Sequence, residues 1–399
     1  MPRCEPFRAL RYKPGTDLDA VIAPPYDVVS EADVDELAAR DAHNIVHVDV
    51  PRGGPDRYAA AAGRMRSWIA DDVLVADDEP TFTLYRMRFT DAAGVDRDLV
   101  GVLGGVEVVD EGAGGVLPHE RTTPKASTDR LDLTRATAAN LSPIWGLSLA
   151  TGLTALLTEP AEPVGAVTVD GVEHAVERVR DPERIAAIRD HLSGDDVLIA
   201  DGHHRYAISR TYRDEVRAAT GRTDTAAEQT LAFVGELVAD QVSVEAIHRL
   251  YSGVPAVKLR EALAGSFAME PADLPGSGTL AEMGERGRLL LLEPGGGATW
   301  LIPDGGALAE ARALDGAWLE HALAVAGLAD DVEVRYQHGL TETSQAVEHG
   351  EAAAAVLIRP VSIAEIQRTA REGLLMPPKS TFFTPKLRTG FVVRDLTTG

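Results

Sequence analysis

The 399-residue sequence predicts a mixed α/β (α+β) fold in two parts. An apolar run at 197–199 is followed by a turn glycine and by apolar residues at helical spacing, which indicates a strand, a turn and a helix. The apolar segments 81–89 and 99–109 flank a turn at 91–94, as the strands of an antiparallel hairpin do. Further strand and helix patterns follow residue 253 and predict a second α+β lobe.

The composition indicates an acidic globular protein. A formal charge of -23, from 62 acidic and 39 basic residues, disfavours a nonspecific grip on nucleic acid, which depends on Lys and Arg. The lone Cys4 excludes an internal disulfide and suits a reducing compartment. No apolar run is long enough to span a bilayer. We therefore expect a cytoplasmic protein without nucleic-acid or membrane partners; the sequence does not indicate its oligomeric state.

The N-terminal region combines a proline-rich loop with a capped helix. Pro24-Pro25-Tyr26-Asp27 must be extended, because a residue before proline is excluded from the helical region. Asp27 either contacts a ligand or forms hydrogen bonds with the backbone of its own turn. Ser30 is predicted to cap the following helix. The alternating residues 44–50 predict a strand, and the pattern of 56–69 predicts a helix.

A polar cluster, Pro118-His119-Glu120-Arg121, follows the hairpin on a loop. Glu120, with His119 beside it, is the best general-base candidate outside the turn at 201–206, because a carboxylate within reach of a hydroxyl can take its proton. The alternative is a salt bridge on a surface loop. In the helix that follows, Asp129 and Arg130 could equally be a helix-dipole aid and a surface charge.

The densest cluster of ionisable groups is the turn after the 197–199 strand. Its first helical N–H groups lack partners within the helix, so an anion is favoured there, and the Arg205 fork matches a phosphate. The alternative is a helix start that Asp201 caps, with structural histidines. The predicted phosphate-binding residues of this turn are Asp201, Gly202, His203, His204 and Arg205.

The last cluster is an extended segment, 377–386, which its prolines keep from becoming helical. Lys379 and Lys386 place positive charge there in an otherwise acidic chain, which suggests phosphate binding. Structural closure by Phe382 and Phe383 is an equally weighted alternative.

Four strings carry a family resemblance along nearly the whole chain. They are APPYDVVS at 23–30, HERT at 119–122, DGHHRY at 201–206 and MPPKSTFFTPK at 376–386. Together they resemble the uncharacterised domain-of-unknown-function family ten-fifteen. The DGHHRY string also resembles the phosphate-binding signature of the ParB/sulfiredoxin-like superfamily, which includes free L-serine kinases. One departure is Ala246-Ile247-His248-Arg249, where the family usually has Pro-Thr-His-Arg, so any role for His248 is in doubt.

The resemblance implies a ParB-like nucleotide-binding core at 1–253 and an α+β lobe at 254–399 whose C-terminal arm returns to the core. It implies a small-molecule kinase that transfers a phosphoryl group from ATP or ADP to a metabolite hydroxyl, with L-serine the first candidate. Asp201 would help to hold Mg²⁺, and Glu120 or Asp27 would activate the acceptor. A ParB-like regulatory module that binds nucleotide without phosphotransfer is the alternative. A sulfiredoxin-like reductase would need a Cys where His203 stands.

Overall fold

The computed structural model describes residues 1–92, 94–120, 127–276 and 278–397. The chain forms two compact units. The first unit comprises Met1–Ser243, Ala370–Gly373 and Phe383–Gly399, and the second comprises Val244–Thr369 and Leu374–Phe382. The second unit is therefore an insertion in the chain, and the C-terminal residues belong to the first.

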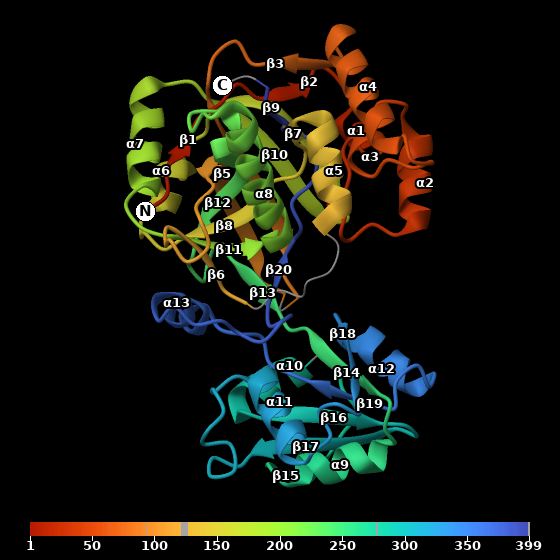
Figure 1. Ribbon diagram of the computed structural model, residues 1–399. Coiled ribbons are helices and arrows are strands. Elements are labelled where there is room, and N and C mark those ends of the chain that lie inside the picture. Colours follow the sequence, from red (N-terminus) through yellow and green to blue (C-terminus); the bar gives the residue numbers. More distant parts are fainter. Residues whose placement is uncertain (93, 121–126, 277, 398–399) are drawn as a thin grey trace. The chain divides into compact units, whose positions relative to one another are not determined.

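The first unit is built on a nine-stranded mixed sheet with the order β6-β11-β8-β12-β5-β4-β10-β9, to which β1 adds beside β5 (Figure 1). Its strands are β1 (Cys4–Glu5), β4 (Phe82–Thr90), β5 (Asp96–Glu107), β6 (Val116–Pro118), β8 (Ile144–Ser148), β9 (Glu162–Val169), β10 (Val172–Val179), β11 (Val197–Asp201) and β12 (Gln229–Glu236). Short strands β2 (Leu10–Tyr12), β3 (Leu74–Ala76), β7 (Ala139–Asn140) and β21 (Arg394–Asp395) form two further pairs, β2-β3 and β7-β21.

Strand direction gathers three chain segments at one edge of this sheet. β11 runs parallel to β6, with Ile199 opposite Pro118, and antiparallel to β8, with Asp201 opposite Trp145. The carboxyl ends of β6 and β11 and the start of β8 therefore meet at the same edge. His119 and Glu120, which directly follow β6, are brought beside the turn that follows β11.

Helices of the first unit flank the sheet and its N-terminal elements (Figure 1). They are α1 (Leu18–Val21), α2 (Glu31–Arg40), α3 (Val46–Asp49), α4 (Arg57–Ala70), α5 (Ser127–Thr137), α6 (Leu153–Thr158), α7 (Pro182–Leu192), α8 (His203–Thr220) and the 3₁₀ turn η1 (Ala226–Glu228). The helix α5 packs between α4 and α8. The core joins sheet residues such as Phe82 and Val234 to Leu157 of α6 and Leu192 of α7.

The second unit is a six-stranded antiparallel sheet with the order β15-β17-β16-β19-β14-β18. Successive side chains of a strand point to opposite faces, so Leu289 and Leu291 of β16 enter one apolar core and Leu290 and Leu292 another. The remaining elements along 243–384 are β13 (Ser243–Glu245), β14 (His248–Ser252), α9 (Ala256–Ala264), β15 (Phe267–Ala272), α10 (Thr279–Arg286), β16 (Leu289–Glu293), β17 (Gly297–Pro303), α11 (Asp315–Val325), β18 (Glu333–Gln337), α12 (Leu340–Glu348), β19 (Ala354–Leu357), α13 (Ile363–Arg371) and β20 (Phe382–Thr384).

The mixed α/β class is confirmed, and so are the hairpin β4-β5, the Ser30 cap of α2 and the helix α4. The strand expected at 44–50 is wrong, because Val46–Asp49 forms the short helix α3. The Asn44 amide explains the difference: it donates to the carbonyls of Ala20 and Ile22, and its oxygen accepts from Val46 N and starts the helical turn. In the described part of the chain, no helix combines the length and apolarity needed to cross a membrane.

Candidate functional site

Gly202 forms the turn between β11 and α8 and is the N-cap residue of that helix. Its φ of 88° lies in the left-handed region, and a Cβ there would lie 3.1 Å from Arg205 Cζ. Glycine is thus required both by the backbone and by the Arg205 side chain. No side chain caps α8 within the described chain, so Asp201 does not act as its cap. The positive end of the α8 dipole therefore faces the turn without a side-chain acceptor.

Asp201 bridges two cations at this turn. Its Oδ2 accepts from Arg205 Nη2 at 2.7 Å, and its Oδ1 accepts from Lys386 Nζ at 3.1 Å. Burial alone would raise the pKa of Asp201, but Lys386 and Arg205 lower it to about 2. The carboxylate is therefore ionised at neutral pH. Lys386 reaches it from the C-terminal segment, whose Thr389 and Val393 also bond to Ala23 and Leu10 of the first unit.

Arg205 is held on several sides, with its side chain 10% exposed. One Nη1 hydrogen bond goes to the carbonyl of Pro143, just before β8. Asp27 Oδ2 lies 3.8 Å from Nη2, and the Tyr26 ring lies 6.0 Å from Cζ. The Arg205 Nε has no hydrogen-bond partner among the described residues. The proline-rich loop predicted from the sequence thus lies against the guanidinium.

His119 and Glu120 lie on the other side of the same turn. Burial lowers the pKa of His119 to about 4, so the ring is neutral. Its Nδ1 lies 2.6 Å from the carbonyl oxygen of Ile199, which can only accept, so Nδ1 carries the proton. The ring centroids of His119 and His203 are 5.0 Å apart, and Glu120 Oε2 lies 4.0 Å from His119 Nε2. The structure therefore brings Glu120 to the same sheet edge as Arg205.

The remaining predicted residues fall in different places. His203 is half-buried and His204 is exposed, both in the first turn of α8. Lys379 belongs to the second unit, where its carbonyl accepts from Arg249. His248 is buried in β14 and accepts from the Ile358 amide. Arg121 and Thr122 of the HERT string lie outside the described residues.

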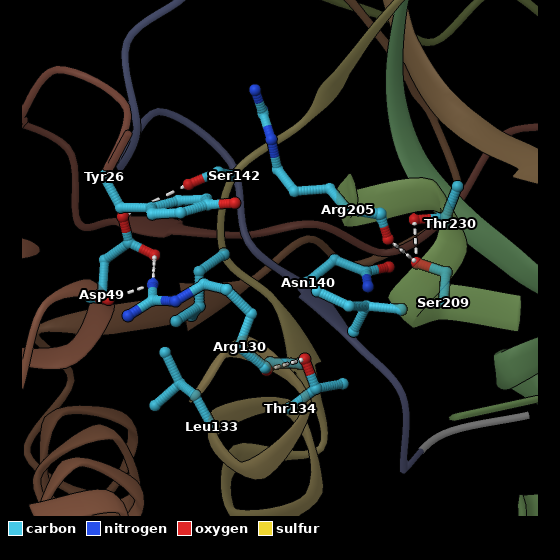
Figure 2. A pocket seen from close by; sticks show the side chains of 13 residues that line it. Tyr26, Asp49, Arg130, Leu133, Thr134, Asn140, Ser142, Arg205, Ser209 and Thr230 are labelled. Carbon is cyan, nitrogen blue, oxygen red and sulfur yellow. Dashed lines mark hydrogen bonds and ion pairs between the residues drawn. The ribbon is translucent and has the colours of Figure 1, made fainter. Parts of the chain in front are cut away.

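A pocket beside Arg205 contains polar residues that sequence reasoning missed (Figure 2). Asp49 is buried there, and burial raises the pKa of its carboxyl group. It accepts from Ser142 Oγ at 3.3 Å, and Arg130 Nη1 donates to its carbonyl. The guanidinium of Arg130 lies 4.4 Å from the centre of the Tyr26 ring. The pocket is lined by Tyr26, Asp49, Arg130, Leu133, Thr134, Ala139, Asn140, Leu141, Ser142, Arg205, Ile208, Ser209 and Thr230.

Of the alternatives for Arg130, a surface charge does not hold, because its side chain is only 11% exposed. Leu133 and Thr134 line the same pocket, and they follow Arg130 at the spacing of one helix face. That spacing was the available signal, since a residue on the face of Leu133 points inward. For Asp49 the local sequence carried no such signal.

These side chains together form a cationic turn with carboxylates around it. Arg205, Lys386 and the amino end of α8 favour an anion, whereas Asp27 and Glu120 can accept a proton. The described residues contain no group of three or more His, Cys, Asp or Glu side chains that would hold a metal ion. Both oxygens of Asp201 already bind cations, so its placement does not fit a Mg²⁺ ligand.

Fold and site define a mixed α/β protein with a cationic turn at the start of a long helix. The chain belongs to DUF1015, a family of proteins of unknown function, whose model matches residues 4–317. No curated protein matches it.

Solved structures with a similar chain course include a conserved hypothetical protein from Pyrococcus furiosus, at 15% identity and a TM-score of 0.39, covering 71% of this chain and 94% of that one. A free serine kinase in complex with AMP matches at 14% identity and a TM-score of 0.39, with 71% and 88% covered. SbnI with a C-terminal truncation, from Staphylococcus aureus, matches at 15% and 0.40, with 73% and 87% covered.

Proposed function

We propose that this protein is a cytoplasmic small-molecule kinase with a ParB/sulfiredoxin-like core, which transfers a phosphoryl group from ATP or ADP to a metabolite hydroxyl. The observation that carries the proposal is the pair of cations, Arg205 and Lys386, held by Asp201 at the uncapped start of α8. Such a turn offers two positive charges and the positive end of the α8 dipole to the same phosphate group. L-serine is the first acceptor to test, because the DGHHR string resembles that of free serine kinases.

In this proposal Asp201 keeps the two cations in place before nucleotide arrives. Phosphate oxygens then accept from Arg205, Lys386 and the first amides of α8, with His203 and His204 bordering the same turn. Positioning and charge neutralisation supply most of the catalysis in phosphoryl transfer, so a covalent nucleophile is not required. A phosphate role for Lys379 also stays a proposal.

Glu120 is the proposed general base, and Asp27 is the other candidate. Glu120 is 15% exposed and lies beside a neutral His119, whose proton is engaged with Ile199. His119 thus offers Glu120 no positive charge at neutral pH. The bond forms between the acceptor oxygen and the terminal phosphorus, and the nucleotide leaves with the electrons of the broken P–O bond.

Mg²⁺ accompanies nucleotides in most kinases and was assigned to Asp201 from the sequence. The ion pairs of Asp201 with Arg205 and Lys386 oppose that assignment. The same ion pairs favour a second candidate function, a regulatory module that binds nucleotide by charge alone. Nucleotide binding without turnover would distinguish it from the kinase.

The test separates binding from chemistry with purified protein, ATP or ADP as donor, Mg²⁺ in the buffer and hydroxylated amino acids as acceptors. Arg205→Ala should weaken nucleotide binding by about 1.5–3 kcal/mol, the range for hydrogen bonds to charged groups. Glu120→Gln should still bind nucleotide but lower turnover by about 10²–10⁴. Arg222→Ala is the control, since Arg222 pairs only with the exposed Asp224 among the contacts described.

The outcomes are distinct. Unchanged nucleotide affinity in Arg205→Ala contradicts the phosphate site. Wild-type turnover in Glu120→Gln moves the base to Asp27. Nucleotide binding without transfer to any acceptor would refute the kinase function and support the regulatory module.

A further inference from the structure

A second hollow in the first unit adjoins the cationic turn through Lys386. It lies between the proline-rich loop, the β9-β10 turn and the C-terminal segment. Its lining includes His174, Lys386 and Arg388. Only Lys386 has a role in the proposed phosphoryl transfer. Lys386 lines this hollow while its Nζ reaches Asp201 at the turn, so a ligand here would adjoin the proposed phosphate site.

His174 presents a hydrogen-bond donor whose tautomer follows from its neighbours. The amide of Arg388 donates to Tyr85 Oη at 3.0 Å, and among the described contacts only His174 Nδ1 can accept the proton of this buried hydroxyl. That proton goes to His174 Nδ1, which lies 2.8 Å away and therefore accepts. Burial lowers the pKa of His174 to about 4, so the neutral ring carries its one proton on Nε2. This Nε2 is buried and has no hydrogen-bond partner among the described residues.

Arg388 presents a second donor of the same kind. Its Nη2 donates to Asp170 at 2.7 Å, whereas its Nε is buried without a partner in the described chain. The Arg388 side chain is 12% exposed. Two buried N–H groups without acceptors are costly to a fold, and a ligand that only accepts would satisfy both.

The charged side chains around the hollow indicate which hydrogen-bond-accepting group it would bind. Lys386 and Arg388 bring two positive charges, but Asp33 and Asp170 also line it, and Asp201 already shares Lys386. A dianionic phosphate would meet this balance less well than a group with a single negative charge. A flat carboxylate offers two oxygens, which matches two N–H donors.

We infer that His174 and Arg388 form a subsite for the carboxylate of the acceptor, which makes the substrate a hydroxylated carboxylic or amino acid. The inference rests on the proposed function for the identity of the ligand as acceptor. Lys386 then contacts both ligands, since it belongs to the carboxylate subsite and to the phosphate site. The acceptor hydroxyl is presented to the phosphates by a group that does not react.

The experiment follows the His174 ring by ¹⁵N nuclear magnetic resonance at pH 7, with His174→Phe to assign its signal. The full-length protein is titrated with glycolate, the smallest hydroxylated carboxylate, with glycolamide, its uncharged match, and with inorganic phosphate. Glycolate should shift the Nε2 signal, and glycolamide should not. Arg388→Lys keeps the charge but removes the Nε–H, and should weaken glycolate binding by about tenfold or more. Arg97→Lys is the control, because Arg97 pairs with Asp91 outside this hollow.

Equal shifts with glycolate and glycolamide, or no shift with glycolate, would overturn the subsite. A response to phosphate alone would overturn the carboxylate assignment. Because binding is read without nucleotide, these results are independent of turnover. Carboxylate binding at His174 in a protein that transfers phosphate to no acceptor would support the subsite and remove only the kinase.

Discussion

The ion pairs of Asp201 make the stability of the first unit depend on one carboxylate. Replacing Asp201 with Asn keeps the shape of the side chain and removes its charge. Arg205 and Lys386 then face each other's positive charge without the anion that now lies between them. We expect Asp201→Asn to lower the free energy of unfolding at neutral pH.

The size of the effect follows from the pKa of Asp201. A folded-state pKa of about 2 against the ordinary 3.8 is equivalent to about 2 kcal/mol of stability. Breaking a fully buried pair would cost about 3–5 kcal/mol, but the Asp201 side chain is 25% exposed, so water screens part of the loss. Because the folded pKa is the lower one, this stabilisation is present above pH 3.8 and is lost as the pH falls toward 2.

Urea unfolding at pH 7 and pH 3 measures this difference. Replacing Trp300 and Trp318 with Phe leaves Trp68 and Trp145, so fluorescence reports only the first unit. The stability deficit of Asp201→Asn should be about 2 kcal/mol at pH 7 and smaller at pH 3. Asp224→Asn, at an exposed ion pair, should change little at either pH. An unchanged midpoint at pH 7, or the same deficit at both pH values, would refute the reasoning.

Three further perturbations test other parts of the first unit. Gly202→Ala strains a residue with φ of 88° and crowds Arg205, so thermal melts should show a loss of about 1–3 kcal/mol; Gly221→Ala, at the other end of α8 with no atom within 4 Å of its Cβ, should lose less, and equal losses would contradict the crowding. Deleting the chain from Phe383 removes β21, and calorimetry should then show no cooperative unfolding of the first unit. A retained cooperative transition would show that this segment is dispensable. Arg130→Met leaves a buried carboxylate without its cation and should cost about 3–5 kcal/mol in urea unfolding, whereas a loss below about 1 kcal/mol would assign Arg130 a surface role.

The sequence predicted the parts of this protein that are encoded locally. The turn around Gly202 could be predicted because strand, glycine and helix follow one another within a few residues. The helix α2 could be predicted because Ser30 and Asp33 form a complete capping box. Asp49 could not be found in this way, since its burial depends on Arg130 and Ser142, which are distant in the chain.

The same distinction holds for the candidate site. The polar strings around Glu120 and Lys386 were visible, but their distance from Arg205 depends on strand pairing and on the path of the C-terminal segment. The hydrogen-bond donors of His174 and Arg388 could not be predicted from the sequence, because a tautomer and an unpartnered guanidinium nitrogen depend on how the side chains pack.

The insertion of the second unit sets an order of assembly during synthesis. A ribosome has produced all of β1 to β12 before it starts the second unit, and it adds Lys386 only after that unit is complete. Until then Asp201 of the nascent first unit can pair with Arg205 but not with Lys386. A chain that terminates after β12 but before Lys386 therefore contains every strand of the nine-stranded sheet but lacks the second cation that binds Asp201. Formation of the complete turn thus requires translation of the whole inserted unit.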